Sequence, residues 1–371
     1  MTPPTLPAMR DRLTAWLARD AYQIWWEAGA DRAGGGFHDQ LSLAGAPVAE
    51  PKRARVQARQ AFCYARAAEF SWRGPWEAAM AHGLDFLETR HRRSDGFYRA
   101  FVGGGADEAL VDLYDQAFVL LALAAAARVG DVQAPAAALA LLGRLPAHSL
   151  GGFRDLGEGT LRANPNMHLF EAALAWIEAG GGSAWRVLAE SQARLALDRL
   201  IEPETGALSE VFGENWRPVA NLAARRIEPG HQYEWAWLLM RWSRLAGEPA
   251  ALAAALRLME AAESAGVDPA RRVAINLLTG DLRPVDRAAR LWPQTERLKA
   301  ALLAAEITGE DAFRVIARQA LEGLIPYLEV PTAGLWRDRL DADGRFVEEP
   351  AKASSFYHLV VAIGELGRAA G

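Results

Sequence analysis

A short glycine-containing phrase recurs along the chain, mostly at steps of about 55–60 residues, and no other feature constrains the fold as strongly. Each phrase joins a glycine to alternating apolar and polar residues, which predicts a tight turn and a short strand. Between phrases the chain is apolar at helical spacing, usually with room for two helices. The phrases are GGFHD (35–39), DGFYRAF (95–101), GGFRD (151–155), GALSEVF (206–212), a weaker GDL (280–282) and GLWRDRL (334–340).

Six units of helix, helix and short β-turn that close on themselves form an (α/α)6 barrel. Closure is expected because no single repeat can bury its apolar face alone. We therefore predict an all-α fold of twelve helices with short β-hairpins at one mouth, and one domain over residues 1–371. The expected helices are 7–27, 53–70, 75–90, 112–129, 132–144, 166–179, 183–199, 231–246, 249–265, 287–307, 310–325 and 352–369.

Alternate helices of such a barrel form an inner and an outer ring. Segments 132–144 and 249–265 are rich in Ala and Leu, which is typical of outer helices with a polar solvent face. The axis should be a cleft lined by polar and aromatic side chains, and it is the expected site. The segments predicted to line it are 53–70, 112–129, 166–179, 231–246 and 352–369.

Composition and motifs exclude several classes of protein. The net charge of −5 offers no basic stripe for nucleic acid. No apolar run approaches the ~20 residues that span a bilayer, and the N-terminus has no signal-peptide core, so a cytoplasmic protein is expected. The single cysteine, Cys63, cannot form an intrachain disulfide. No GxGxxG, GxxxxGK[ST] or GxSxG phrase supports nucleotide-cofactor or serine-hydrolase chemistry.

Three of the seven histidines, His168, His231 and His358, fall on predicted inner helices. Each alone could be a hydrogen-bonded core histidine, but three converging on one axis favour a functional site. His231 lies near the start of its helix, where the dipole should lower its pKa and keep the imidazole neutral. A neutral imidazole near pH 7 is a usable general base.

A glutamate follows two of these histidines by three residues, as Glu171 after His168 and Glu234 after His231. Positions i and i+3 share a helix face. Such pairs also occur in carboxylate-bridged metal sites, but a di-iron centre would need two further inward glutamates and no thiol is available for zinc. We therefore expect no metal, and each glutamate to orient a histidine or bind a sugar hydroxyl.

Other polar and aromatic residues complete the predicted cleft. Arg59 could neutralise a developing oxyanion there, or lie on the surface. Tyr114 and Asp115 open another inner helix, and Asp115 could be a buried hydrogen-bond partner or a catalytic acid. Most tryptophans should be core residues, although four lie near the proposed mouth, where aromatic faces suit a sugar ring. These four are Trp235, Trp237, Trp292 and Trp336.

Six segments, in order over nearly the whole chain, resemble the N-acylglucosamine 2-epimerase superfamily. The PGHxxEW and MHxxEA elements are the most specific, and the family's (α/α)6 barrel agrees with the repeats. The segments are RARVQARQAFCYA (53–65), DLYDQAFVL (112–120), NPNMHLFEA (164–172), EPGHQYEWAWLL (228–239), LWPQTE (291–296) and SFYHL (355–359).

The resemblance implies roles by position. His231 and His358 match the family's paired catalytic histidines, and Arg59 matches the arginine near the C1 and C2 oxygens of the sugar. An arginine before the PGH element often contacts substrate, and here Arg225 and Arg226 compete for that place. The residues that match substrate-contacting positions are His168, Glu234, Tyr114 and Trp336, with Asp115 beside them.

The family's chemistry is proton transfer next to a carbonyl, and its short PGH and WPQTE segments look closest to bacterial mannose isomerase-like members. We therefore expect interconversion of D-mannose and D-fructose on a free monosaccharide, without a cofactor, by a monomer or homodimer. A sugar 2-epimerase is an alternative, as is an isomerase of phosphosugars, in which Arg59, Arg225, Arg226 and Arg337 would form the anion site. More distant alternatives are an inverting glycoside hydrolase, with Asp115, Glu171, Glu234 and Asp338 as candidate carboxylates, and a non-catalytic interaction protein.

Overall fold

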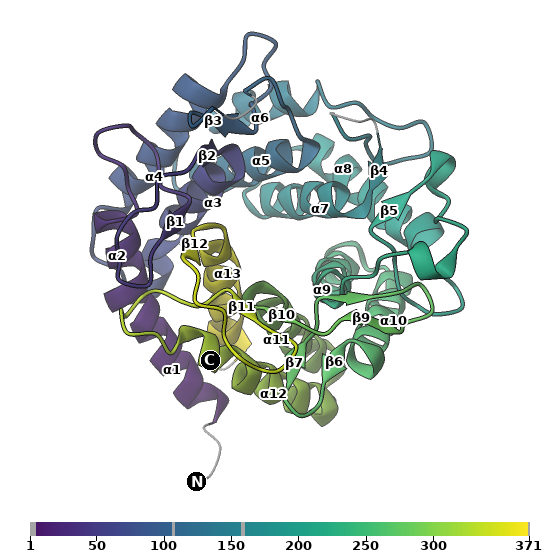
Figure 1. The fold of residues 1–371 in the computed structure, drawn as a ribbon. Coiled ribbons are helices and arrows are strands. Elements are labelled where there is room, and N and C mark those ends of the chain that lie inside the picture. The colour runs from purple at the N-terminus through teal and green to yellow at the C-terminus, as the bar shows by residue number, and fades with distance from the viewer. Residues whose placement is uncertain (1–4, 106–107, 157–159, 370–371) are drawn as a thin grey trace.

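The fold is a closed ring of paired helices, seen along its axis in Figure 1. The computed structural model describes residues 5–105, 108–156 and 160–369. Each inner helix packs against the next inner helix around the axis. The inner helices are α3 (Ala54–Ala65), α5 (Leu113–Arg128), α7 (Ala163–Glu178), α9 (Pro229–Ala246), α11 (Leu291–Thr308) and α13 (Ser354–Ala369).

An outer helix packs on the back of each inner one, which confirms the predicted (α/α)6 barrel. The first outer helix is α1 (Leu6–Trp16) continued through a π turn into α2 (Tyr22–Glu27), so the described residues form twelve helices around the ring. The remaining outer helices are α4 (Trp76–Phe86), α6 (Ala134–Leu142), α8 (Ser183–Leu195), α10 (Pro249–Ala265) and α12 (Asp311–Leu328).

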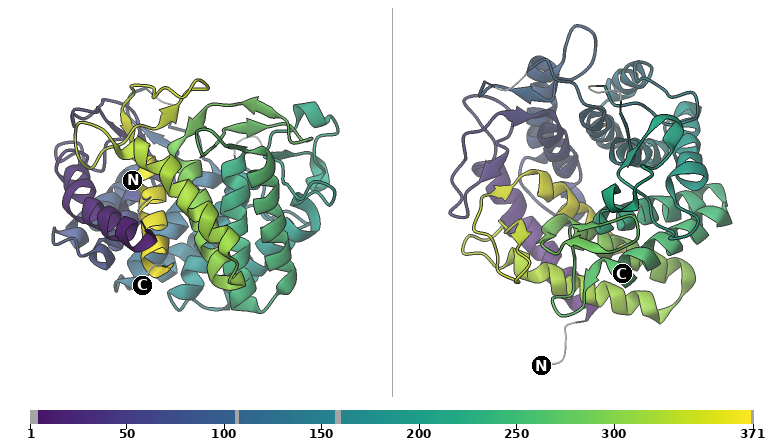
Figure 2. Two further views of the ribbon diagram at one scale, coloured as in Figure 1. Left: turned by 90° about the horizontal axis from the view of Figure 1, so that it is seen from below. Right: turned by 45° about the vertical axis from the view of Figure 1, so that its right-hand side comes forward.

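Short antiparallel strand pairs lie at one end of the barrel (Figure 2); four of them join neighbouring repeats, and two are local hairpins between α10 and α11. The pair between β1 (Gln40–Leu41) and β12 (Ala351–Lys352) closes the ring between its first and last repeats. The other pairs are β2 (Lys52–Arg53) with β3 (Phe101–Val102), β4 (Leu161–Arg162) with β5 (Val211–Phe212), β6 (Val267–Asp268) with β7 (Val273–Ala274), β8 (Leu277–Leu278) with β9 (Pro284–Asp286), and β10 (Ala289–Arg290) with β11 (Arg339–Leu340).

The two rings follow from where the apolar residues lie. Inner helices such as α3 and α11 are buried on nearly every side, whereas outer helices such as α8 bury one face. Several ends carry the expected signals: Pro229 begins α9, the Asp112 side chain caps α5, and Gly247 ends α9 with φ of +69°. None of the helices among the described residues has the length and apolar character needed to span a bilayer.

A buried amide side chain fixes the repeated phrase to the inner helix that follows it. In the first repeat, Gln57 accepts a hydrogen bond from the Phe37 N–H and donates one to the Phe37 carbonyl, at 2.6 and 2.9 Å. One amide thereby satisfies both polar groups of a buried peptide unit. We name this bidentate contact the amide clamp; its members are Gln57 on Phe37, Gln116 on Tyr98, Asn166 on Phe153, Gln232 on Leu208 and Gln294 on Ala274.

The clamps correct the position assigned to the fifth repeat. The weak GDL phrase at 280–282 is not its turn, because the clamped residue is Ala274, on the hairpin of β6 and β7. Gly280 also lacks the positive φ of the other phrase glycines and lies beside the additional hairpin of β8 and β9. The phrase glycines with φ between +71° and +93° are Gly35, Gly96, Gly151, Gly206 and Gly334.

Candidate active site

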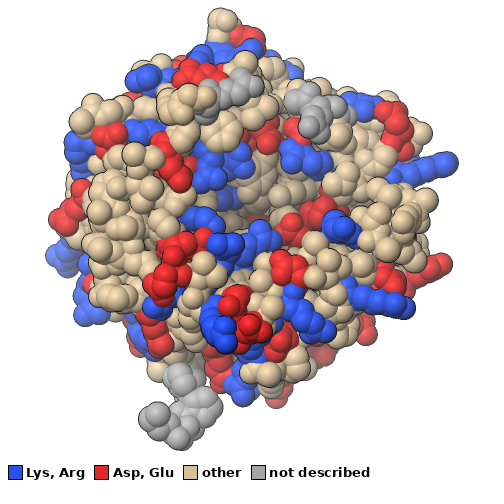
Figure 3. Space-filling model, viewed as in Figure 1, with Lys and Arg blue, Asp and Glu red and all other residues tan. Residues whose placement is uncertain are grey.

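A cavity of about 240 Å³ opens at the strand end of the barrel, at the hollow in the centre of Figure 3. Lys and Arg side chains gather around this hollow. Its walls come from the first turns of the inner helices and from the strands that precede them. The lining residues are Arg53, Arg55, Arg59, Tyr114, Asn164, His168, Glu228, His231, Glu234, Arg290, Trp292, Asp338, Lys352, Ser354, Ser355 and His358.

All three predicted inner-ring histidines line this cavity, and each one has its Nδ1 on a glutamate. Nδ1 of His168 lies 3.0 Å from Glu171 Oε2, and Nδ1 of His358 lies 2.7 Å from Glu296 Oε1. Because an ionised carboxylate only accepts, such a contact places the hydrogen on Nδ1 and leaves Nε2 for another partner. The third contact joins His231 Nδ1 to Glu210 Oε2 at 2.8 Å.

His358 and His168 are held in the neutral form. Burial lowers the pKa of His358 well below its usual 6.5, and the positive charges of Arg59 and Lys299 lower it further. Burial also lowers the pKa of His168 to about 4, against the opposing effect of Glu171. Each ring therefore has an Nε2 lone pair at neutral pH, which is what a general base requires.

His231 carries a proton, and here the expectation from its place in the helix was wrong. Burial would lower its pKa, but the carboxylates of Glu210 and Glu228 outweigh burial and raise the pKa to about 9. These charges are stronger than the partial charge of the helix terminus. The carboxylate that accepts from its Nδ1 is Glu210, which directly precedes strand β5, and not Glu234, one turn later on the same helix.

The Trp292 indole lies between the protonated His231 and the neutral His358. Its ring centroid is 4.9 Å from that of His231 and 5.5 Å from that of His358. Both histidines therefore face the same part of the cavity. A flat apolar face between an acid and a base suits the ring or the extended chain of a sugar.

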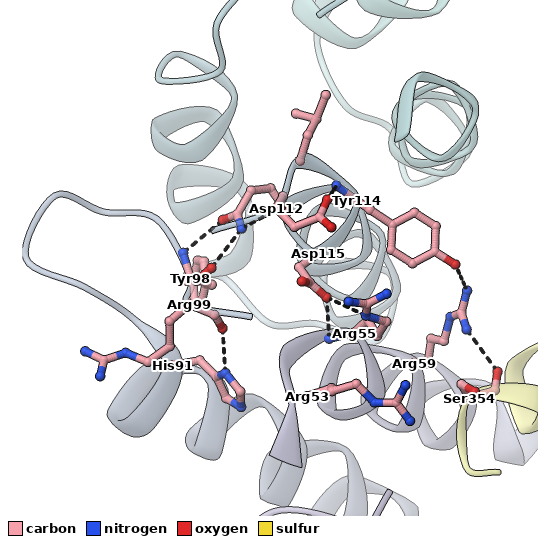
Figure 4. Close-up of polar contacts among 12 residues, drawn as sticks. Arg53, Arg55, Arg59, His91, Tyr98, Arg99, Asp112, Tyr114, Asp115 and Ser354 are labelled. Atoms are coloured by element: carbon pink, nitrogen blue, oxygen red, sulfur yellow. Dashed lines mark hydrogen bonds and ion pairs between the residues drawn. The ribbon is translucent and has the colours of Figure 1, made fainter. Parts of the chain in front are cut away.

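Arg59 presents a buried guanidinium to the cavity (Figure 4). Its Nη2 donates to the Tyr114 hydroxyl at 2.7 Å and its Nη1 to the Ser354 carbonyl at 3.2 Å. Among the described residues no carboxylate lies within ion-pair distance of it, although the residue is only 4% exposed. A buried cation held by neutral acceptors is suited to stabilising negative charge that appears on a substrate oxygen.

Glu234 is a buried acid with free hydrogen-bonding capacity. It is 1% exposed, and neither carboxyl oxygen has a hydrogen-bond partner among the described residues. Burial, with repulsion from Glu296 and Glu171, raises its pKa well above the usual 4.5. A carboxyl group that is protonated can donate to a sugar oxygen and accept from a hydroxyl.

Several predicted site residues lie outside the cavity lining. Asp115 is fully buried behind it, where it accepts from the Arg55 backbone N–H and pairs with Nε of the same residue (Figure 4). Arg225 pairs with Glu202 and donates to a backbone carbonyl. Arg226 and Arg337, proposed for an anion site, are likewise absent from the lining.

Trp336 is a core residue, so the expectation that it contacts substrate is corrected. Its ring is stacked on Trp25 and Phe356 and has no exposed surface. It follows its phrase glycine by two residues, and this place in the repeat is buried in the other phrases too. The equivalent residues are Phe37, Tyr98, Phe153 and Leu208.

Replacing Trp336 by Ala should therefore weaken the fold and leave the chemistry intact. We expect the free energy of unfolding to fall by about 3–5 kcal/mol, the usual cost of emptying a buried aromatic site. Urea unfolding gives this value, and Trp336→Phe should lose much less. Activity per folded molecule, measured well below the transition, should change only slightly; a selective loss of turnover would contradict the core assignment.

Several site residues had no role in the sequence analysis. Glu296 was visible only as the last letter of LWPQTE, and Glu210 only inside a repeat phrase. Their pairing with histidines depends on neighbours 62 and 21 residues away. The cations of the rim also gave no signal; they are Arg53, Arg55, Arg290 and Lys352.

The site contains three groups of His and Glu that could reach one cation by distance. These are His168 with Glu171 and Glu234, Glu234 with Glu296 and His358, and Glu210 with Glu228 and His231. Apart from Glu234, each group is held together by a His–Glu contact, and the Lys299 ammonium lies 2.5 Å from Glu296 Oε2. Lys299 and the His231 proton supply the positive charge that a metal ion would bring, so the arrangement fits a proton-transfer network.

Comparison with known proteins identifies the family. The sequence model of the N-acylglucosamine 2-epimerase family matches residues 35–362. The chain belongs to the N-acylglucosamine 2-epimerase family. It is 43% identical over 95% of both chains to a protein named mannose-6-phosphate isomerase from Rhizobium meliloti (strain 1021). It is also 28% identical to the D-mannose isomerase of Thermobifida fusca over 89% of both chains.

A solved structure supports the architecture. The crystal structure of a D-mannose isomerase superposes with a TM-score of 0.86 over 97% of both chains at 20% identity. At that identity the likeness concerns the fold. Membership of the epimerase family makes the chain an enzyme of the isomerase class that acts on sugars.

Proposed function

We propose that the protein is an aldose–ketose isomerase that interconverts D-mannose and D-fructose through a cis-enediol(ate). The observation that carries the proposal is the pair of histidines in different protonation states around Trp292, a neutral His358 and a protonated His231 on one cavity. Such a pair offers a base and an acid at the same pH. The names of the two relatives, both isomerases of mannose or its phosphate, support the same reaction type.

The residues divide the reaction between them. His231 can exchange a proton with O1 and O5 to open the ring. Nε2 of His358 then takes the C2 proton, and the charge that moves to O1 is stabilised by the Arg59 guanidinium. Return of the proton to C1, with transfer of the O2 proton to O1, gives the ketose. Glu234, His168 and Tyr114 lie where they can bind the remaining hydroxyls.

A 2-epimerase would use the same groups with a different final step. It must return a proton to C2 from the opposite face, which requires a second group in its protonated form on that face. His231 carries such a proton, so the pair of histidines is compatible with either reaction. The names of the two relatives, both isomerases, favour the isomerase, in which one base moves the proton between C2 and C1.

Proton NMR of D-mannose incubated with the protein in deuterated water tests the proposal. We expect fructose signals, with deuterium entering C1 of fructose and C2 of the remaining mannose by exchange at the base. Glucose without fructose would replace the proposal by a 2-epimerase. Release of reducing sugar from a disaccharide, without isomerisation, would replace it by a hydrolase. Boiled protein is the control for spontaneous exchange.

Mannose 6-phosphate is a second candidate substrate, favoured by the cations at the rim of the cavity. Arg53 and Lys352 line the cavity with side chains that are 27% and 31% exposed, and Arg290 lies on the same lining. Each is paired with an acid but keeps donors that could reach a phosphate. The relative named mannose-6-phosphate isomerase points the same way.

The two substrates can be separated by one ratio. If the phosphate is recognised, kcat/KM should be higher for mannose 6-phosphate than for mannose, and Lys352→Gln should lower the ratio by about tenfold, as expected for one lost charge-assisted contact. An equal or lower value for the phosphate, with no effect of Lys352→Gln on the ratio, would leave free mannose as the substrate.

The charge of His231 predicts the pH dependence. Because its pKa is raised to about 9, the acid form is present at neutral pH and is lost only as the pH rises through 9. We expect kcat/KM to stay level from pH 6.5 to about 8 and to fall above about 9. Glu210→Gln removes the nearest carboxylate and should move this alkaline limb to lower pH. If the alkaline limb does not move in Glu210→Gln, that limb does not report the titration of His231.

A further inference from the structure

A lysine is buried in the barrel beneath the cavity floor. Lys299 on α11 has a side chain with no exposed surface, and its Nζ lies 2.5 Å from Glu296 Oε2 and 4.0 Å from the centre of the Trp237 ring. It does not line the cavity. Burying an ammonium is costly unless it is paired, so this position requires a reason.

Lys299 is connected to the proposed base through the two oxygens of one carboxylate. Glu296 is also fully buried; its Oε2 faces the ammonium, and its Oε1 lies 2.7 Å from His358 Nδ1. While Glu296 is ionised it can only accept, so the hydrogen is on Nδ1 and the lone pair on Nε2. A protonated Glu296 would donate to Nδ1, which would move the hydrogen to Nε2 and remove the lone pair.

We propose that Lys299 is a positioning residue: its ammonium keeps Glu296 ionised and so holds His358 in the tautomer that can accept the C2 proton. The inference rests on the proposed isomerase function and adds to it a residue that never touches the sugar.

The surrounding charges fix the sign of the effect. Burial raises the pKa of Glu296, and Lys299 opposes that rise. Two further acids face Lys299, namely Glu234 on α9 and Glu171 on α7. The His358 ring also has Arg59 on α3, His168 on α7 and Tyr357 on α13 as charged or titratable neighbours. Since Lys299 is one cation among three acids, its removal raises the pKa of every group in the cluster.

Lys299→Met is the direct test. We expect kcat at pH 7 to fall by about 10-fold or more with a small change in KM, since the sugar contacts remain. The acidic limb of kcat/KM should move up by about one pH unit or more, so that activity recovers as Glu296 ionises at higher pH. Lys299→Arg, which keeps the charge, should leave the limb closer to its wild-type position.

Arg297→Met is the matched control. Arg297 lies on the same helix with an equally buried side chain, but it pairs with Glu263 on the outer side of the ring. Its loss should destabilise the protein without moving the acidic limb. Equal limbs in Lys299→Met and wild type, or equal shifts in Lys299→Met and Arg297→Met, would overturn the proposal.

A second readout needs no substrate and separates this inference from the proposed function. In ¹⁵N-histidine NMR, the wild-type signal that disappears in His358→Gln should have the pattern of a neutral ring protonated on Nδ1. In Lys299→Met at pH 7 it should change to the Nε2–H form or to imidazolium. An unchanged tautomer would overturn the role of Lys299 even if mannose is isomerised, and the expected change would support it even if another sugar is the substrate. If Lys299→Met lacks the native circular-dichroism spectrum, Lys299→Gln carries the same comparison.

Discussion

Replacing His358 by Gln should lower kcat for mannose isomerisation by about 10²–10⁴-fold, the range that a general base contributes. Gln retains a donor for Glu296 Oε1 and fills a similar volume, so the fold should be preserved. What is lost is the neutral Nε2 on which C2 proton removal depends. Exchange of the C2 proton of mannose with deuterated water, followed by NMR, should be lost in parallel with fructose formation.

His148→Gln provides the control for this experiment. His148 lies in the loop before the third phrase, away from the cavity lining, and its Nδ1 accepts from the Leu150 N–H. Its replacement should change kcat less than twofold. If His358→Gln retained C2 exchange while fructose formation stopped, His358 would be the group that returns the proton rather than the one that removes it.

Replacing Arg59 by Met should lower kcat/KM by about 10²–10³-fold, comparable to the loss of one donor from an oxyanion site. The guanidinium is the buried cation that faces the cavity without a carboxylate partner among the described residues, so no other group can take its place. The effect should be mainly on kcat if the charge on O1 develops only in the transition state.

Two further arginine variants test the geometry. Arg59→Lys keeps the charge but cannot hold both the Tyr114 hydroxyl and the Ser354 carbonyl, so it should restore only part of the activity. Arg225→Met removes an arginine that lies outside the cavity lining and should have almost no effect on kcat/KM. A large loss in Arg225→Met would place that side chain on the substrate after all.

The barrel fold could be predicted because the features that produce it are local in the sequence. Glycine phrases and helical apolar spacing repeat in the sequence, and twelve helices with short strands at one mouth follow from them. The fifth repeat was misplaced because its turn contains no phrase glycine, and the glycine to which the phrase was assigned, Gly280, belongs to an additional hairpin. The clamp residue Gln294 is the signal that could have located that turn, through Ala274.

The site was predicted in its residues but not in its charges. Inner-helix periodicity brought His168, His231 and His358 to one axis. Which carboxylate meets which histidine depends on chain segments from other repeats, so Glu210 could not be paired with His231 from spacing. The same remote carboxylate makes the pKa of His231 rise, where the sequence analysis predicted a fall. Trp336 could have been recognised as a core residue from its place in the phrase.

The amide clamps allow local opening of the barrel to be measured repeat by repeat. Each clamped N–H is buried and bonded to a side chain on the inner helix that follows it. It can therefore exchange with solvent only when that turn segment separates from the helix. The five clamped amides therefore report on five separate joints of the ring. In native-state hydrogen exchange, a lower protection factor at one clamped amide would show that the barrel opens locally at that repeat. Five equal protection factors would show that it opens as one unit.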